Sequence, residues 1–582
     1  MENKIYSING PVVTVRHADV FHMLEKVYVG NERLLGEVIS ISTEKTTIQV
    51  YESTTGLVPG EPVFATGEPI SALLGPGLLK NIFDGIERPL KTIADDAGIY
   101  IPIGSDVESL DSQRLWNVNI TVNVDDQLDG GAIYATIQET SMIEHRLLVP
   151  GDQKGKVTWV ATSGTYTLFD TIVKIIDEKG VEKDLTLAQK WPIKVPRPVK
   201  KRLTIATPLI SGQRVIDTLF PIAKGGTAAV PGGFGTGKTM MQHQFAKWCD
   251  ADIIVYVGCG ERGNEMTQVL EEFSELIDPR TDKPLLERTV LIANTSNMPV
   301  AAREASIYTG VTIAEYYRDM GYHVAVMADS TSRWAEALRE ISGRLEEMPA
   351  EEGFPAYLPS RISQFYERAG YMDNLNDSKG SVTIIGAVSP QGADFSEPVT
   401  QNTKRFVRSF WALDKQLAYA RHYAAINWNQ SYSDYVGDLT KWYEKNVGPE
   451  FLIDRTKIMG LLAEETKLLE IVKLIGSDVL PDDQKLIIEI GKVIRMGYLQ
   501  QNAFHKDDTY VPLEKQLLMM DVIIHLFEQA KHVVSEGKSL NVLIETGIFE
   551  EVVKMKYDVP NDALDRFDEY IKNIDRIVKR MK

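Results

Sequence analysis

The sequence predicts a multidomain protein in which β-rich segments precede and interrupt an α/β nucleotide-binding core, and a helical domain follows it. Three observations predict this fold class. Residues 232–239 fit a phosphate-binding pattern at every required position. Apolar strand-like runs alternate with helical stretches from about residue 200 to residue 435. Beyond that point apolar residues recur at spacings of three, four and seven, as they do in amphipathic helices.

The first domain is expected to span residues 1–70 and to consist of β-strands. Short runs rich in β-branched residues are separated there by turn residues. Their ranges are 11–15, 26–29, 36–41 and 46–51. Strands at such close spacing are typical of a small barrel or sandwich.

A second β module is expected at residues 115–185, inserted into the core. Apolar and polar residues alternate in 116–124 and again in 156–160, with turn residues between them. The proline-rich stretch 191–198 then forms a stiff return, because each proline fixes its own φ and restricts the residue before it. The core would comprise the flanking ranges, 71–114 and 186–435.

The core itself is expected to hold a mainly parallel sheet, because its apolar runs are separated by helical stretches. The runs are 226–230, 252–257, 289–293, 323–328 and 381–385. In open sheets of this kind ligands bind at the carboxyl ends of the strands. Several of these runs end at a polar or acidic residue, so we expect a ligand site there.

The phosphate-binding pattern lies between the first of these runs and a predicted helix at 240–249. Its glycines allow backbone N–H groups to turn toward phosphate oxygens, and a helix N-terminus adds a partial positive charge. Lys238 would reach the β- and γ-phosphates, and the Thr239 hydroxyl would be a ligand of Mg²⁺. A glycine-rich turn could meet the pattern by chance, but the strand and helix on either side favour a nucleoside triphosphate site.

Two acidic residues follow other strands of the core. Asp329 ends the apolar run 323–328, where such an acid commonly helps to hold Mg²⁺. Glu261 follows the strand after the predicted helix, with Arg262 beside it. A carboxylate there could polarise the attacking water and a guanidinium could offset phosphate charge. Residue types alone equally allow an ordinary surface Glu-Arg pair in a turn.

The last domain, residues 436–582, is expected to be a bundle of helices. One apolar stripe is especially regular, and its members are Ile458, Leu461, Leu462, Leu468, Leu469, Val472 and Ile475. Similar stripes run through 486–494 and 517–534. Stripes of this kind are usually buried against neighbouring helices, so we expect a domain core and not a partner surface.

Composition limits the function classes. The chain has 582 residues and a formal net charge of −18, which disfavours a nucleic-acid partner because phosphate neutralisation needs a basic surface. The sequence contains no apolar run of membrane-spanning length and no signal-peptide pattern, so we expect a cytoplasmic location. The two cysteines, Cys249 and Cys259, have no metal-site spacing.

Longer strings of residues resemble one family over nearly the whole chain. They include 258–265 around Glu261, 294–304, 328–339 after Asp329, 396–402 and 498–504. With the phosphate loop, they resemble the catalytic A subunit of V/A-type rotary ATPases. The resemblance implies an N-terminal β-barrel, an inserted "bulge" module, a RecA-like phosphate-loop NTPase core and a C-terminal helical bundle.

The resemblance also implies site roles. Glu261 would be the general base or water-positioning residue, Arg262 a phosphate contact, and Asp329 an acid that contacts, through water ligands, the Mg²⁺ that accompanies ATP or ADP. The adenine pocket would draw on Tyr423, Gln501, Ala503 and Phe504, although Tyr423-Ala424 stands where the family usually has Phe-Pro. The nucleotide-binding set is completed by the loop and the residue after it: Gly232, Gly233, Phe234, Gly235, Thr236, Gly237, Lys238, Thr239 and Met240.

The partners implied are a non-catalytic B-type subunit that donates an arginine finger in an alternating hexameric ring, central and peripheral stalk subunits, and a membrane sector that moves H⁺ or Na⁺. The chain would then be a cytoplasmic subunit peripheral to a membrane, acting in ATP hydrolysis or synthesis. Two alternatives remain at this point. One is a non-catalytic nucleotide-binding ring subunit, which Glu261 disfavours. The other is a RecA-like hexameric helicase, which the acidic balance and the inserted module disfavour.

Overall fold

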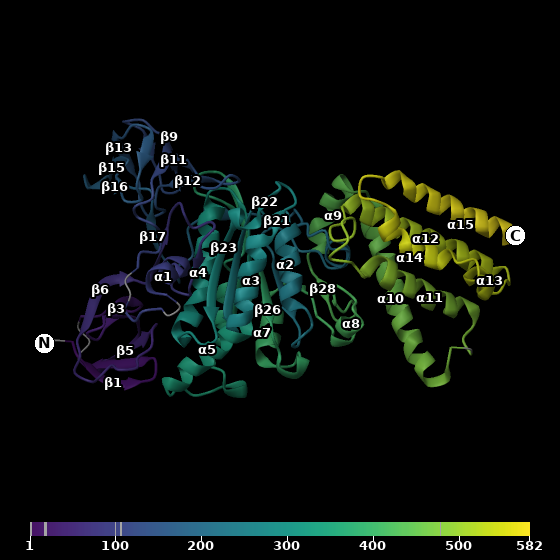
Figure 1. The fold of residues 1–582 in the computed structure, drawn as a ribbon, viewed down its shortest axis with the longest axis horizontal. Coiled ribbons are helices and arrows are strands. Elements are labelled where there is room, and N and C mark those ends of the chain that lie inside the picture. The colour runs from purple at the N-terminus through teal and green to yellow at the C-terminus, as the bar shows by residue number, and fades with distance from the viewer. Residues whose placement is uncertain (1–2, 17–19, 99–100, 105–106, 478, 582) are drawn as a thin grey trace. The chain divides into compact units, whose positions relative to one another are not determined.

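The computed structural model describes residues 3–16, 20–98, 101–104, 107–477 and 479–581. Contacts divide the chain into two compact units (Figure 1). The first unit contains residues 1–204, 224–229 and 251–407, and the second contains residues 205–223, 230–250 and 408–582. Within the described ranges, no helix is both long enough and apolar enough for a bilayer span.

The first unit begins with six antiparallel strands in the order β1-β2-β5-β4-β3-β6. Their bounds are β1 Ile5–Asn9, β2 Val12–Arg16, β3 Glu25–Val29, β4 Leu34–Ile41, β5 Lys45–Val50 and β6 Val63–Pro69. The two outer strands meet, because the Ile5 amide donates to the Glu61 carbonyl at 2.9 Å and the Val63 amide to the Asn3 carbonyl at 2.7 Å. This closure makes the domain a barrel, as predicted, and decides against an open sandwich.

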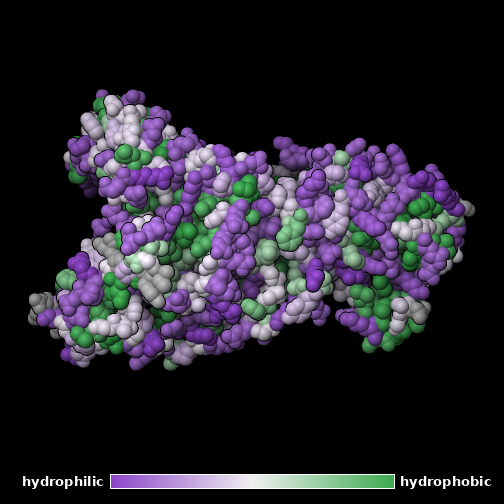
Figure 2. Space-filling model, in the orientation of Figure 1, coloured by the Kyte–Doolittle hydropathy of each residue, from purple (hydrophilic) through white to green (hydrophobic). Residues whose placement is uncertain are grey.

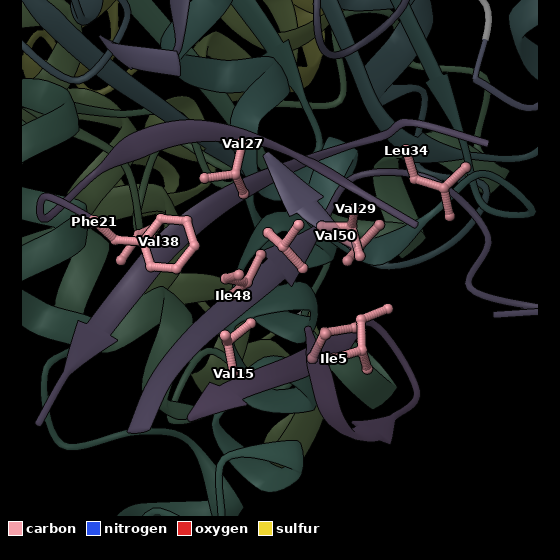
Figure 3. Packing of buried hydrophobic residues seen from close by; sticks show 11 residues of the cluster. Ile5, Val15, Phe21, Val27, Val29, Leu34, Val38, Ile48 and Val50 are labelled. Carbon is pink, nitrogen blue, oxygen red and sulfur yellow. The ribbon is translucent and has the colours of Figure 1, made fainter. Parts of the chain in front are cut away.

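The barrel interior is filled by aliphatic side chains that alternate with outward-facing residues (Figure 3). Val15, Val27 and Ile48 are fully buried there, and Phe21 packs at one end. The predicted runs 11–15, 26–29, 36–41 and 46–51 correspond to β2 through β5. The sequence reasoning missed β1 and β6, which complete the barrel.

The inserted module contains two four-stranded antiparallel sheets, ordered β10-β13-β15-β16 and β12-β11-β9-β14. Its strands are β9 Trp116–Ile120, β10 Gln127–Leu128, β11 Ile133–Gln138, β12 Glu144–Leu148, β13 Gly155–Val160, β14 Gly164–Tyr166, β15 Val173–Ile176 and β16 Glu182–Leu185. The flanking strands β7 (Ser71–Leu74) and β17 (Gln189–Pro192) pair with each other. The chain therefore leaves the core and returns to it at one place, which confirms an inserted β module.

The nucleotide core of the first unit has the strand order β19-β26-β24-β20-β23-β8. The bounds are β8 Ile82–Phe83, β19 Thr227–Pro231, β20 Ile253–Glu261, β23 Thr289–Thr295, β24 His323–Asp329 and β26 Lys379–Val388. Pairing of β26 with β24, of β24 with β20 and of β20 with β23 is parallel, so their carboxyl ends share one edge. The predicted α/β core is confirmed, and every predicted run overlaps one of these strands.

Helices and short strands surround this sheet. The helices of the first unit are α1 Leu90–Ala97, α3 Gly263–Glu275, α4 Val300–Asp319, α5 Thr331–Arg344, α6 Leu358–Tyr366 and α7 Pro398–Phe406. The short strands are β18 Lys201–Arg202, β21 Ile277–Asp278, β22 Lys283–Pro284 and β25 Gly370–Asp373. Helix α4 packs on β20 and β24 and is buried along nearly its whole length, so it is a central helix of the first unit.

The second unit holds the phosphate loop, its helix α2 (Lys238–Trp248) and the C-terminal helices. A π-helical turn, Val215–Leu219, precedes the loop, and β27 (Ser409–Phe410) pairs with β28 (Tyr432–Ser433). The helices are α8 Lys415–Tyr419, α9 Val436–Asn446, α10 Glu450–Ile475, α11 Asp482–Val493, α12 Leu513–Ser535, α13 Leu540–Ile544, α14 Ile548–Asp558 and α15 Phe567–Met581. The predicted helical C-terminal domain is confirmed, whereas the exact domain boundaries stay predictions.

The apolar stripe of α10 is buried only over part of its length. Ile458 and Leu468 are buried, but Ile475 is 53% exposed and its neighbour Leu474 is 85% exposed. Figure 2 shows hydrophobic residues gathered on the surface where α10 ends. The expectation that the stripe would be core up to residue 475 is therefore wrong for its last turn, because α10 extends past the helices that cover it.

Candidate functional site

The phosphate loop of the second unit has the backbone that its sequence requires. Gly235 and Gly237 have φ values of 76° and 85°, in the region that favours glycine. A side chain on Gly232 would lie 2.5 Å from the Thr236 hydroxyl, so that position also needs glycine. Gly237 is the residue before α2, which places the loop at a helix N-terminus. This is the arrangement that binds phosphate anions.

Side chains complete the loop. The Lys238 ammonium donates to the carbonyls of Gly232 and Gly233 at 2.7 and 3.1 Å, which holds the cation over the loop. The Thr236 hydroxyl donates to the Gly233 carbonyl at 2.8 Å. Phe234 is 79% exposed at the loop tip. The loop therefore offers one cation and a ring of backbone donors to a ligand.

The first unit brings two of the predicted acids together. Glu261 ends β20, Asp329 ends β24, and the strands are parallel neighbours, with Gly258 opposite Asp329. The Tyr256 hydroxyl donates to the Asp329 carboxylate at 3.1 Å, and Asp329 is only 3% exposed. Two carboxyl groups at one sheet edge are thus held by the register of the sheet.

Burial, together with the charges of Asp329 and Glu265, raises the pKa of Glu261 to about 8, and the charge of Arg333 opposes this rise. Removing water from around a carboxyl disfavours its charged form, and a neighbouring carboxylate has the same effect. Both effects favour the protonated form of Glu261. A strongly perturbed carboxyl at a strand end is typical of functional sites.

Three arginines lie at the carboxyl end of β20. Arg262 lies next to Glu261, its side chain 61% exposed and 3.7 Å from a carboxylate oxygen of Glu265. Arg303 donates to the Ser296 carbonyl at 2.9 Å, and Arg333 pairs with Glu336 at 2.9 Å. Sequence reasoning assigned no role to Arg303 or Arg333, although both belong to the strings that carry the family resemblance. A Cβ atom at position 260 would lie within 3.0 Å of both arginines. Glycine at this position therefore leaves room for Arg303 and Arg333 at the end of β20.

The predicted adenine-pocket residues lie in the second unit. The Gln501 amide donates to the Tyr423 carbonyl at 2.7 Å, which joins the two segments. Phe504 is 92% exposed, so its ring face is open to a ligand. Ala503 is partly exposed beside it, and Met240 is 40% exposed at the start of α2. Tyr423 is half-buried, and burial raises the pKa of its hydroxyl.

The Gln501 side chain is already engaged. Its oxygen accepts from the Arg214 amide at 3.0 Å and its nitrogen donates to the Gly212 carbonyl at 2.8 Å. Arg214 and Lys556 also bind the Gln500 carbonyl, at 2.9 and 3.0 Å. Neither cation was singled out from the sequence, because they are distant from residues 500–504 along the chain. They fix the conformation of the segment that carries Phe504.

Each unit by itself carries an oxygen donor of the kind that Mg²⁺ binds. The Thr239 hydroxyl and the Asp329 carboxylate are oxygen donors, which this hard cation prefers. Among the described residues, no three acidic, histidine or cysteine side chains form a metal cage. That chemistry suits a cation that keeps its waters and the phosphate oxygens of its nucleotide as ligands.

The fold and these residues define a phosphate-loop nucleoside triphosphatase with a β-barrel, an inserted β module and a helical C-terminal domain. Family models match this chain over most of its length. They describe the beta-barrel domain of the ATP synthase alpha/beta family (residues 5–67), the alpha/beta subunit barrel-sandwich domain (107–194), the alpha/beta nucleotide-binding domain (212–433) and the C-terminal domain of V and A type ATP synthases (440–543).

Individual proteins of the same family are similar to this chain over nearly its whole length. The chain is 59% identical to V-type ATP synthase alpha chain 2 of Clostridium tetani, covering 96% of this chain and 94% of the relative. It is 57% identical to the V-type ATP synthase alpha chain of Halothermothrix orenii, covering 100% and 98%. The structure of the assembled ATPase EscN of the enteropathogenic Escherichia coli type III secretion system shares the fold at a TM-score of 0.63 and 22% identity, covering 90% of this chain and 100% of that one.

The chain belongs to the V/A-type ATP synthase family, in the group that contains the V-type alpha chains. Membership favours an ATP-binding enzyme chain of a multisubunit complex over the helicase and the non-catalytic ring subunit.

Proposed function

We propose that this chain is the subunit in which a V/A-type rotary ATP synthase hydrolyses or makes ATP, and that Lys238, Thr239, Glu261 and Asp329 act on one Mg·ATP. Coupling of ATP turnover to ion transport follows from the family. The observation that carries the residue assignment is the raised pKa of Glu261 beside Asp329 at the carboxyl edge of the parallel sheet. Ligands bind at that edge in sheets of this kind.

Each residue has a chemical task. Lys238 and the backbone donors of the loop bind the β- and γ-phosphates. Glu261 takes or positions the proton of the attacking water, and Arg262 offsets charge on the γ-phosphate oxygens. Thr239 would be a ligand of the Mg²⁺ and Asp329 would contact it through its water ligands, and the ion would supply positive charge at the phosphates. Phe504, presented by the segment that Arg214 and Lys556 fix, stacks on the adenine ring together with Tyr423.

The partners are proposed on the family. An alternating ring with a non-catalytic B-type subunit would supply an arginine finger, and spreading of negative charge in phosphoryl transfer needs such a cation. Central and peripheral stalks would connect this peripheral, cytoplasmic subunit to a membrane sector. We expect little ATPase activity from the isolated chain, and rapid turnover by the pure monomer would contradict this part of the proposal.

The decisive experiment is Glu261→Gln in the assembled complex. ATP binding should stay within about threefold of the unchanged complex, while turnover should fall by about 10²- to 10⁴-fold, the usual contribution of a general base. Glu271→Gln, on the exposed side of α3, is the matched control and should leave both unchanged. Turnover that survives in the Glu261→Gln complex would exclude Glu261 as the base.

A further inference from the structure

One cavity of the first unit, away from the residues predicted for the ATP site, has a strongly cationic lining. Its volume is about 580 Å³, and it is formed by the segment 194–202 that follows the inserted module, by α4, by α6 with the residues after it, and by β25. None of the residues predicted for the ATP site lines it. The cationic side chains are Lys194, Arg197, Arg202, Arg318, Arg361 and Arg368, against the carboxylates of Glu315 and Glu367. A cavity of this size suits a small ligand.

Carboxylates behind the wall neutralise part of this charge. Glu315 binds Arg368 through both oxygens, at 2.9 and 2.6 Å, and Asp319 is shared by Arg197 and Arg318. Lys194 lies 2.6 Å from Glu37 and 3.8 Å from Glu304. Counting Asp319, Glu37 and Glu304 with the two lining acids gives six cations against five carboxyl groups. Burial raises the pKa of Glu304, which increases the positive excess when it holds its proton.

Two cations have donors that these carboxylates do not satisfy. Arg197 is only 5% exposed, and its Nη1 has no hydrogen-bond partner among the described residues. Arg361 is half-buried and interacts with the Tyr308 hydroxyl, and no ion pair within 4.0 Å joins it to a described carboxylate, so the unpartnered buried donor here is that of Arg197. A buried charged donor without a partner is costly, because it has lost water without gaining a replacement. An anion in the cavity would supply the missing acceptor.

We propose that this cavity is a binding site for a small phosphate anion, distinct from the phosphate loop. Guanidinium groups match phosphate oxygens through paired N–H donors, and several of them converge here. The enclosed volume admits phosphate, pyrophosphate or a small phosphorylated metabolite and excludes a nucleic-acid strand or a folded partner. The site does not depend on the proposed ATP chemistry, because it shares no residue with it.

An anion bound in the cavity would also contact both α4 and α6. Tyr308, Glu315 and Arg318 belong to α4, which packs against the strands that carry Glu261 and Asp329. Arg361 belongs to α6. An anion bridging the two helices would stabilise the folded chain in proportion to its concentration above the dissociation constant.

The test uses the full chain with Lys238→Ala, so that the phosphate loop does not contribute, and pyrophosphate as the probe in isothermal titration calorimetry. We expect one site with a dissociation constant below about 1 mM. Adding Arg361→Gln should weaken binding by about tenfold or more, since one charge-assisted hydrogen-bond pair is lost. Adding Arg405→Gln, which removes an exposed arginine of α7 in the same unit, should not.

Two outcomes would overturn the proposal. One is the absence of a binding heat at millimolar pyrophosphate, and the other is equal binding in the Arg361→Gln and Arg405→Gln chains. Gln364→Glu is a second variant for the case that Arg361→Gln does not fold. Gln364 is exposed on α6 at the cavity, so a carboxylate there should repel the anion without disturbing the core. Unchanged affinity in that variant would equally contradict the site.

Discussion

The phosphate loop and the acid pair are specified in different ways. The loop is made of eight consecutive residues, and its ligand donors are mostly backbone N–H groups positioned by positive φ angles at Gly235 and Gly237. The acid pair joins Glu261 to Asp329, which are brought together only by the parallel register of β20 and β24. A local conformation determines the first, and tertiary packing determines the second.

The two regions also differ in their response to protons. The contribution of the loop comes from backbone dipoles and a lysine, whereas the acid pair contains a carboxyl whose pKa is about 8. Substitutions in the loop should therefore alter the affinity for ATP at every pH. Substitutions in the acid pair should alter the rate of ATP turnover and its dependence on pH.

The largest expected effect on nucleotide affinity comes from Lys238→Ala. Loss of the ammonium that binds the β- and γ-phosphates should weaken ATP binding by about 100-fold, as expected for losing charged hydrogen bonds. Titration of the assembled complex with a fluorescent ATP analogue measures this. Lys247→Ala, at the far end of α2, is the control and should change affinity little. Equal affinity in the two variants would remove the loop from the binding site.

The pH dependence of turnover tests the acid pair. Because Glu261 must lose its proton to act as a base, kcat/KM should rise about tenfold per pH unit below its pKa and level off near pH 8. The profile should be measured at several Mg·ATP concentrations on the assembled complex. A flat profile between pH 6 and 9 would show that no group with this pKa takes part.

The same pKa predicts a change in stability. The folded-state pKa of Glu261, about 8, lies above the ordinary value of 4.5, so its contribution is complete below pH 4.5 and is lost as the pH rises through 8. Relative to Glu261→Gln, the unchanged chain should therefore lose about 4 kcal/mol of unfolding free energy between pH 5 and pH 9, because each unit of pKa difference corresponds to about 1.4 kcal/mol. Urea unfolding at both pH values measures this. Glu340→Gln, exposed on α5, should show no such difference.

The smallest expected effect belongs to the adenine segment. Phe504→Ala should weaken ATP binding by about 5- to 30-fold through lost stacking, with almost no cost in stability because the ring is 92% exposed. Phe504→Tyr should preserve the affinity. If instead both variants bound ATP normally, adenine would be recognised elsewhere.

The sequence predicted the loop and the strand positions well, because both depend on nearby residues. The glycine pattern of 232–239 directly encodes the loop, and each apolar run of the core appears as a strand. The environment of Glu261 could not be predicted in the same way. Residues 329 and 333 become its neighbours only through the order of the sheet, which the spacing of the motifs does not contain.

Packing accounts for the other differences. Gln501 was expected in the adenine pocket, but its amide is engaged by residues 212 and 214, which the sequence gives no reason to place beside it. The end of α10 has the pattern of a buried stripe, yet no described helix covers Ile475. Periodicity tells which face of a helix is apolar and does not tell where the covering elements end.

The central claim, that the loop and Glu261 serve one nucleotide, is tested most directly by the pKa of Glu261 with and without Mg·ATP. Infrared difference spectroscopy of the carboxyl band, assigned with Glu261→Gln, can measure it in the assembled complex. We predict that saturating Mg·ATP shifts the pKa by about one unit or more, because the charges of the nucleotide lie close by, and that Lys238→Ala abolishes the shift at the same concentration. An unchanged pKa in the presence of bound Mg·ATP would contradict the claim.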